Sequence, residues 1–151
     1  MSNYAFFGVS SVAVAGSRHG TPYAVAPVLA ALVSAGVIVR TGCARGVDAL
    51  ARAGVPCGQL CVLDAQDFKG ANFAQQLANR TVAVVMGAGA LVVFPGADGI
   101  GRGSALAIAT ALRVGLPCWV AGVAPSGHGW QPLALAGVAG WACVPPPSLF
   151  D

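Results

Sequence analysis

The sequence predicts an α/β protein built on a doubly wound, mostly parallel sheet, in three α/β/α layers. Short apolar runs alternate with helix-like stretches, the order that builds parallel sheets through right-handed crossovers. Apolar residues make up 56% of the chain and charged residues only 9%, so we expect strands that are buried on both faces. Glycine-rich turns separate several strands from the helices that follow. The length of 151 residues is that of one domain, and we expect residues 1–151 to form it.

The elements follow from local patterns taken in chain order. Short apolar or β-branched runs, most of them ending near a glycine or a turn, predict strands at 11–15, 37–40, 57–63, 90–94 and 118–121. Small apolar residues at helical spacing, with Pro22 in the first turn of the first helix and a glycine after each end, predict helices at 22–35, 47–53, 72–86 and 104–114. Residues 64–70 read as a loop, and 141–144 as an edge strand that ends before three prolines. This alternation is Rossmann-like and implies the strand order 3-2-1-4-5.

Three of the strand ends carry glycine-rich turns that are suited to a phosphate. Glycine lets backbone N–H groups approach a ligand closely, a helix N-terminus carries partial positive charge, and arginine adds a full charge. We therefore expect a nucleotide-like ligand to contact Gly16, Ser17, Arg18, Gly42, Ala44, Arg45, Gly46, Asp48, Pro95, Gly96, Gly99, Gly101, Gly103 and Ser104. A single Gly-x-Gly pattern is weak evidence, but three at successive strand ends are much stronger.

Several of these residues have two readings. Asp48 is either a catalytic carboxylate or a helix cap and arginine partner, and Ser104 reads as a helix cap or phosphate donor rather than a nucleophile. His19 could act as an acid or base near the first turn. The chain has no glutamate, so any mechanism that needs one is excluded; its acids are Asp48, Asp64, Asp67, Asp98 and Asp151.

Charge and cysteine content narrow the remaining possibilities. The net charge of +3 rests on seven arginines and one lysine, which suits forked recognition of phosphate better than a broad nucleic-acid surface. Five cysteines without a CxxC pattern predict buried free thiols and no metal site. Neither an export signal nor an apolar run of about 20 residues is present, which predicts a cytoplasmic protein without a membrane span. So few charges also predict a homo-oligomer.

Three motifs resemble a known family. Val12 to Arg18 is similar to a strand followed by a Gly-Ser-Arg turn, Gly42 to Asp48 to the signature Gly-x-Ala-Arg-Gly-x-Asp, and Leu91 to Gly96 to a strand that ends in Phe-Pro-Gly. Asn79-Arg80 matches an Arg-Asn pair in reversed order. The chain thereby resembles the Rossmann-like SLOG superfamily, which includes DprA/Smf, YspA/YpsA-like and Lonely Guy proteins, and it is most similar to the small YspA and DprA-core type.

The resemblance implies a nucleotide-binding function. Gly103 stands where Lonely Guy enzymes carry their catalytic glutamate, which argues against an enzyme of that kind. We expect a sensor or carrier of a small phosphorylated, nucleotide-like ligand, with no certain cofactor and no metal. The alternatives are a nucleoside-phosphate hydrolase or transferase with Asp48 or Asp98 as base, and a DprA-like protein that binds single-stranded DNA.

Overall fold

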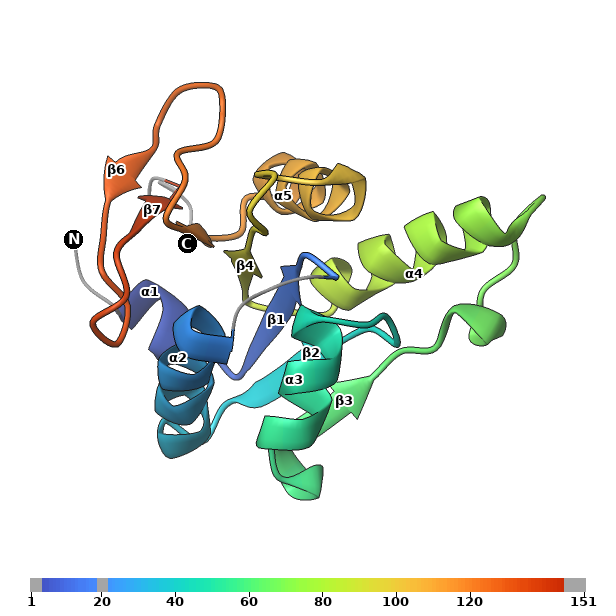
Figure 1. Cartoon of the computed structure of the whole chain (residues 1–151), viewed down its shortest axis with the longest axis horizontal. Helices are drawn as coiled ribbons and strands as arrows, with labels where there is room; N and C mark the ends of the chain where they lie inside the picture. Colours follow the sequence, from blue (N-terminus) through green and yellow to red (C-terminus); the bar gives the residue numbers. More distant parts are fainter. Residues whose placement is uncertain (1–3, 19–21, 146–151) are drawn as a thin grey trace, which may run out of the picture.

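The strands form one mixed sheet in the computed structural model, which describes residues 4–18 and 22–145 (Figure 1). In the described chain these strands are β1 (Ser11–Gly16), β2 (Ile38–Thr41), β3 (Leu60–Val62), β4 (Ala90–Phe94), β5 (Cys118–Ala121), β6 (Gln131–Pro132) and β7 (Gly140–Cys143). Their order across the sheet is β3-β2-β1-β4-β5-β7-β6. The first five strands pair in parallel and in the predicted order, whereas β7 is antiparallel to both β5 and β6.

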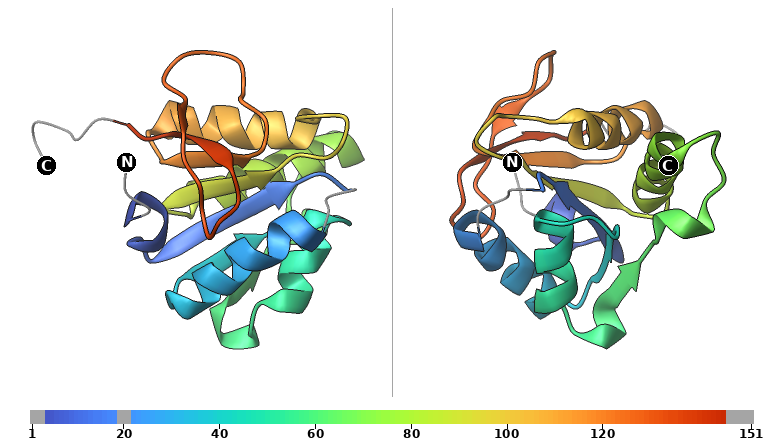
Figure 2. Two further views of the ribbon diagram at one scale, coloured as in Figure 1. Left: turned by 60° about the vertical axis from the view of Figure 1, so that its left-hand side comes forward. Right: turned by 45° about the vertical axis from the view of Figure 1, so that its right-hand side comes forward.

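Helices cover both faces of this sheet, so the predicted α/β/α layering is confirmed (Figure 2). The described helices are α1 (Tyr4–Phe7), α2 (Pro22–Ser34), α3 (Val47–Gly54), α4 (Phe73–Met86) and α5 (Arg102–Val114), with short 3₁₀ turns η1 (Cys57–Gln59) and η2 (Ala65–Asp67). The side chains of α1, α2 and α3 pack on one face, and those of α4 and α5 pack on the other. None of the described helices has both the length and the apolar character that crossing a membrane requires.

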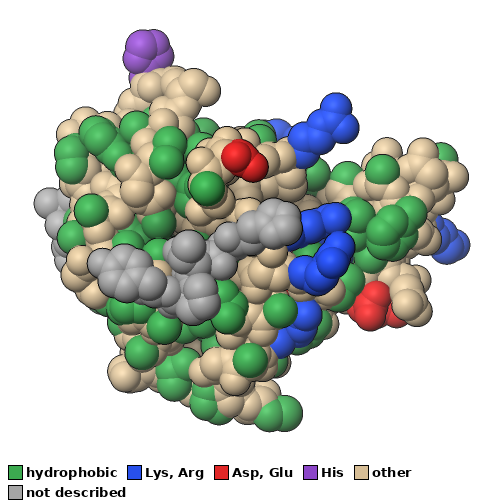
Figure 3. All heavy atoms as spheres, in the orientation of Figure 1, with side chains coloured by type: hydrophobic (Ala, Val, Ile, Leu, Met, Phe, Trp, Pro, Cys, Tyr) green, Lys and Arg blue, Asp and Glu red, His purple; other side chains and the backbone are tan. Residues whose placement is uncertain are grey.

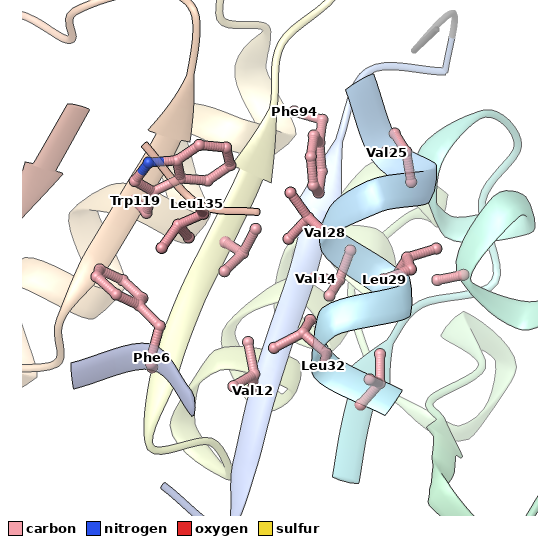
Figure 4. Packing of buried hydrophobic residues seen from close by; sticks show 14 of the residues in the cluster. Phe6, Val12, Val14, Val25, Val28, Leu29, Leu32, Phe94, Trp119 and Leu135 are labelled. Carbon is pink, nitrogen blue, oxygen red and sulfur yellow. The ribbon is translucent and has the colours of Figure 1, made fainter. Parts of the chain in front are cut away.

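Alternate residues of the central strands enter opposite layers of the core. Val12 and Val14 of β1 pack under α2, while Ala13 between them faces α4 and α5 (Figure 4). Every residue of β4 is buried for the same reason. Strands covered on both faces need apolar side chains at every position, which explains the low charge content of the chain.

Two strand expectations were wrong. The third strand is confined to β3, because residues 57–59 form η1, in which the N–H of Gln59 donates to the carbonyl of Pro56 at 2.9 Å. β7 lies where the edge strand was expected, but β6 pairs with its outer side and is the true edge. The proline in β6 suits that position, because an edge residue can lack a donor on its solvent side.

Smaller differences concern helix starts and thiols. Helix α4 begins one residue later than expected, because the side chain of Asn72 caps it by accepting from the N–H of Gln75 at 2.9 Å. The described cysteines are free, as predicted, but only Cys118 is buried, and Cys57 is exposed. The free thiols therefore range from buried through partly buried to exposed.

Candidate functional site

Three turns leave the sheet at the carboxyl ends of β1, β2 and β4, which are neighbours in the order β2-β1-β4. We call residues 16–18 the first turn, 42–46 the second turn and 95–101 the third turn. The chain reverses its winding direction between β1 and β4, and doubly wound sheets bind ligands in the crevice at such a point. The expected ligand-binding residues are therefore gathered at one edge of the sheet.

The first turn is in direct contact with the other two. The N–H of Val47 donates to the carbonyl of Ser17 at 3.0 Å, which joins the second turn to the first. Gly46 has a φ of +71°, and a Cβ there would collide with the backbone of Ser17 and Arg18. A Cβ on Gly96 of the third turn would lie 2.5 Å from the Oγ of Ser17. These two glycines let the three turns close on one another.

Asp48 supports the second turn from inside the protein. Its Oδ1 accepts from the Oγ1 of Thr41 at 3.1 Å and its Oδ2 from the N–H of Ala44 at 3.2 Å. Burial raises the pKa of Asp48 above its usual value, although Arg80 and these hydrogen bonds act in the opposite direction. Of the two readings of Asp48, this geometry matches the structural one, and its arginine partner is Arg80 rather than Arg45.

Arg80 was named only in a motif, yet it lies at the centre of this cluster. It extends from α4 and is buried, with its Nη2 4.0 Å from the Oδ2 of Asp48 and its Nη1 donating to the Sγ of Cys43 at 3.2 Å. Within the described residues its Nε has no hydrogen-bond partner. Gly42 makes room for this side chain, because a Cβ there would lie 2.6 Å from the guanidinium carbon.

Arg52 is a second residue that sequence reasoning missed. From the last turn of α3 its Nη1 donates to the carbonyls of Gly42 and Ala44 at 2.8 and 2.9 Å. Its position four residues after Asp48 on one helix was an available signal, because such residues share a helix face. Asp48 therefore accepts from a backbone N–H of the second turn, and Arg52 donates to two of its backbone carbonyls.

The third turn ends at the start of α5. Gly99 has a φ of +90°, and its N–H donates to the carbonyl of Gly96 at 3.0 Å. The N-cap of α5 is Gly101, which makes no side-chain cap. The cap role expected for Ser104 is therefore wrong: Ser104 lies inside the helix and is buried, since α5 begins two residues before it.

Three arginines lie in or directly after the three turns, and Figure 3 shows several Lys and Arg side chains close together on one side of the molecule. Arg18, Arg45 and Arg102 are all exposed. Among the described residues the one ion pair within 4.0 Å joins Arg80 to Asp48, so none of the three exposed arginines has a described carboxylate within that distance. A Cβ on Gly101 or Gly103 would meet no atom within 4 Å, so neither glycine is required by a close approach, and His19 lies outside the described residues.

Two apolar grooves flank α2. One has a volume of about 540 Å³ and lies at the carboxyl ends of β4 and β5, where it shares Pro95 with the third turn. The other, of about 360 Å³, lies between α2 and α3 and includes no residue of the three turns. Only the first groove is continuous with the candidate site.

No group of three or more histidine, cysteine or acidic side chains comes together among the residues that the structure describes. Comparison of the sequence with protein-family models and with curated proteins finds no match. The argument for function therefore depends on the geometry of the three turns.

Proposed function

We propose that this protein binds a nucleotide or a nucleotide-derived phosphate ligand across the carboxyl ends of β1, β2 and β4, as a sensor or carrier. The observation that carries the proposal is the close approach of the three turns around Ser17. Gly46 and Gly96 are each too close to the first turn to carry a side chain. Such glycines are expected where the backbone itself forms the binding surface, as it does for phosphates.

The electrostatics of this edge favour an anion. Helices α3 and α5 both begin after a glycine N-cap that provides no side-chain acceptor, although at α3 the N–H of Val47 already donates to the carbonyl of Ser17. A helix N-terminus attracts negative charge, and the exposed Arg18, Arg45 and Arg102 add three positive charges without carboxylate partners among the described residues. A phosphate would supply an acceptor at the start of α5 and negative charge beside the arginines.

The state of the acidic residues supports binding over turnover. Both oxygens of Asp48 are occupied by donors from Thr41 and Ala44, which leaves this carboxylate poorly placed to take a proton from a substrate. Asp98, the other candidate base, is exposed in the third turn. The enzyme alternative, with Asp48 or Asp98 as base, therefore depends on Asp98.

The test compares the melting temperature of wild type, Arg18→Ala/Arg45→Ala and Arg113→Ala against nucleoside mono-, di- and triphosphates. A ligand that binds only the folded state raises the melting temperature. We expect stabilisation of wild type and of Arg113→Ala, whose substitution lies in the last turn of α5, away from the three turns. The double variant should bind at least about tenfold more weakly, because hydrogen bonds to charged groups are strong.

Other outcomes separate the alternatives. Stabilisation by a single-stranded oligonucleotide alone, with a steep salt dependence, would favour DNA binding. Release of phosphate or base from a nucleotide, lost in Asp98→Ala, would favour the enzyme. Absence of any response to these ligands would contradict the proposed function.

A further inference from the structure

The groove beside Pro95 extends the candidate phosphate site across the sheet. It is lined by α2, by residue 95 after β4, by residues 121–123 after β5 and by residues 136–139 of the turn before β7. Its volume of about 540 Å³ falls within the range of about 300–1,000 Å³ that is usual for ligand pockets. A ligand whose phosphate lies at the turns would place its remaining part over this groove.

The described residues that line the groove offer no polar side chain. Each of them is alanine, glycine, proline or valine. Three backbone donors of its wall are also engaged: Gly122 donates to the carbonyl of Ala139 at 2.9 Å, Val123 to that of Ala121 at 2.8 Å, and Val138 to that of Leu135 at 2.8 Å. The described wall therefore favours recognition by shape and apolar contact.

We infer that this groove holds the uncharged ring of the ligand, a nucleobase or a similar flat heterocycle, and that it selects this ring by shape rather than by hydrogen bonds. The inference rests on the proposed function, because the phosphate at the turns is what directs the ring into the groove. The described residues of the groove carry no polar side chain that would distinguish the exocyclic groups of adenine from those of guanine. The protein should therefore respond to purine nucleotides as a class.

Binding calorimetry with ribose 5-phosphate, AMP and GMP tests the inference. In wild type, AMP should bind about tenfold or more tightly than ribose 5-phosphate, because the base covers apolar surface. AMP and GMP should differ by less than about tenfold, since apolar pockets discriminate weakly between such groups. A larger difference between the two purines would overturn selection by shape.

Variants locate the base. Ala24→Leu narrows the groove from α2, and Ala139→Leu narrows it from an exposed position on the opposite wall, so the second variant decides the outcome if the first does not fold. In both variants AMP should bind no more tightly than ribose 5-phosphate, and the affinity for ribose 5-phosphate should be unchanged. The matched control, Ala30→Leu, makes the same change on α2 in the other groove and should retain the tighter binding of AMP.

Failure of the inference can be distinguished from failure of the proposed function. The inference is overturned if ribose 5-phosphate binds to wild type and AMP binds no more tightly. It is also overturned if AMP still binds more tightly than ribose 5-phosphate in both groove variants, because the base then lies elsewhere. If neither ribose 5-phosphate nor AMP binds to wild type, both the proposed function and the inference are overturned.

Discussion

The Nη2 of Arg80 on α4 lies 4.0 Å from the Oδ2 of Asp48 on α3, and each side chain is only 9% exposed. The two residues come from opposite faces of the sheet and meet beyond the carboxyl end of β2. Arg80 also donates to Cys43, and Asp48 accepts from Ala44, so the pair encloses the second turn. Part of the candidate site is therefore shaped by a buried charge pair.

Removal of one member of this pair should be more harmful than removal of both. We expect Asp48→Ala to lower the free energy of unfolding by about 3–5 kcal/mol, because it leaves the charge of Arg80 buried without a carboxylate. The double variant Asp48→Ala/Arg80→Met should lose clearly less than the sum of the two single variants. Denaturant unfolding measures all three, and strict additivity would show that the two side chains are not coupled.

The raised pKa of Asp48 predicts how its contribution depends on pH. The folded protein then holds the Asp48 proton more tightly than the unfolded chain, whose usual value is 3.8, so rising pH lowers stability between 3.8 and the raised folded value. Asp48→Asn removes the titrating carboxyl at residue 48 and leaves the other titratable groups in place. The excess stability of wild type over Asp48→Asn should therefore be greatest in acid and decrease through that interval. An excess that increases with pH would show that the folded pKa is lowered.

The stability losses of Gly46→Ala and Gly36→Ala should show how much the close approach of the first and second turns matters. Gly46 and Gly36 both have a positive φ, of +71° and +75°, but only at Gly46 would a Cβ meet other atoms. We expect Gly36→Ala to cost about 1–2 kcal/mol for the conformation alone. Gly46→Ala should cost more and should weaken nucleotide binding, which unfolding and calorimetry can measure together. Equal losses of stability would mean that the first and second turns can move apart.

Arg40 should stabilise the end of α4. From β2 its Nε donates to the carbonyl of Val84 at 3.0 Å and its Nη2 to that of Ala83 at 2.9 Å. Arg40→Met removes both charge-assisted bonds and should lower the free energy of unfolding by about 1.5–3 kcal/mol. Arg113→Met, an exposed residue in the last turn of α5, is the control and should change it by less than about 0.5 kcal/mol. Similar losses in the two variants would argue against a specific role for Arg40.

The cysteines should differ widely in reactivity. Cys57 is exposed, whereas Cys118 is buried and its pKa is raised by burial and by the neighbouring Cys143, which disfavours the reactive thiolate. A disulfide reagent followed by mass spectrometry should modify Cys57 first and Cys118 only on unfolding. Cys57→Ser should remove the fast phase. Early modification of Cys118 in the native protein would contradict the buried position of β5.

The parts of the fold that could be predicted are those with strong local patterns. The strands at β4 and β5 were predicted residue for residue, because each is an apolar run bounded by turn-forming residues. The third strand was overextended, because an apolar run cannot show that Pro56 begins a 3₁₀ turn. The two-residue β6 was missed, since so short a strand exists only by pairing with β7.

The candidate site divides in the same way. Gly46 and Gly96 could be selected from sequence because strand-to-helix turns require such residues. Arg80 could not, since its role depends on contacts with residues 42–48 that only packing creates. Arg52 could have been noticed by its spacing from Asp48, but its bond to the carbonyl of Gly42 also depends on packing. Ser104 was expected to cap α5, but the N-cap is Gly101, so Ser104 lies inside the helix.

The sequence by itself determined the layered α/β fold, the order of the parallel strands and the edge at which the glycine turns meet. These follow from hydrophobic periodicity and from the handedness of crossovers, both of which are local in origin. Only the tertiary structure decided that Asp48 is buried against Arg80, that Ser17 is enclosed by two other turns, and that an apolar groove adjoins them. Those relationships join residues that are distant in the chain, and they arise when helices from opposite faces of the sheet pack around one edge.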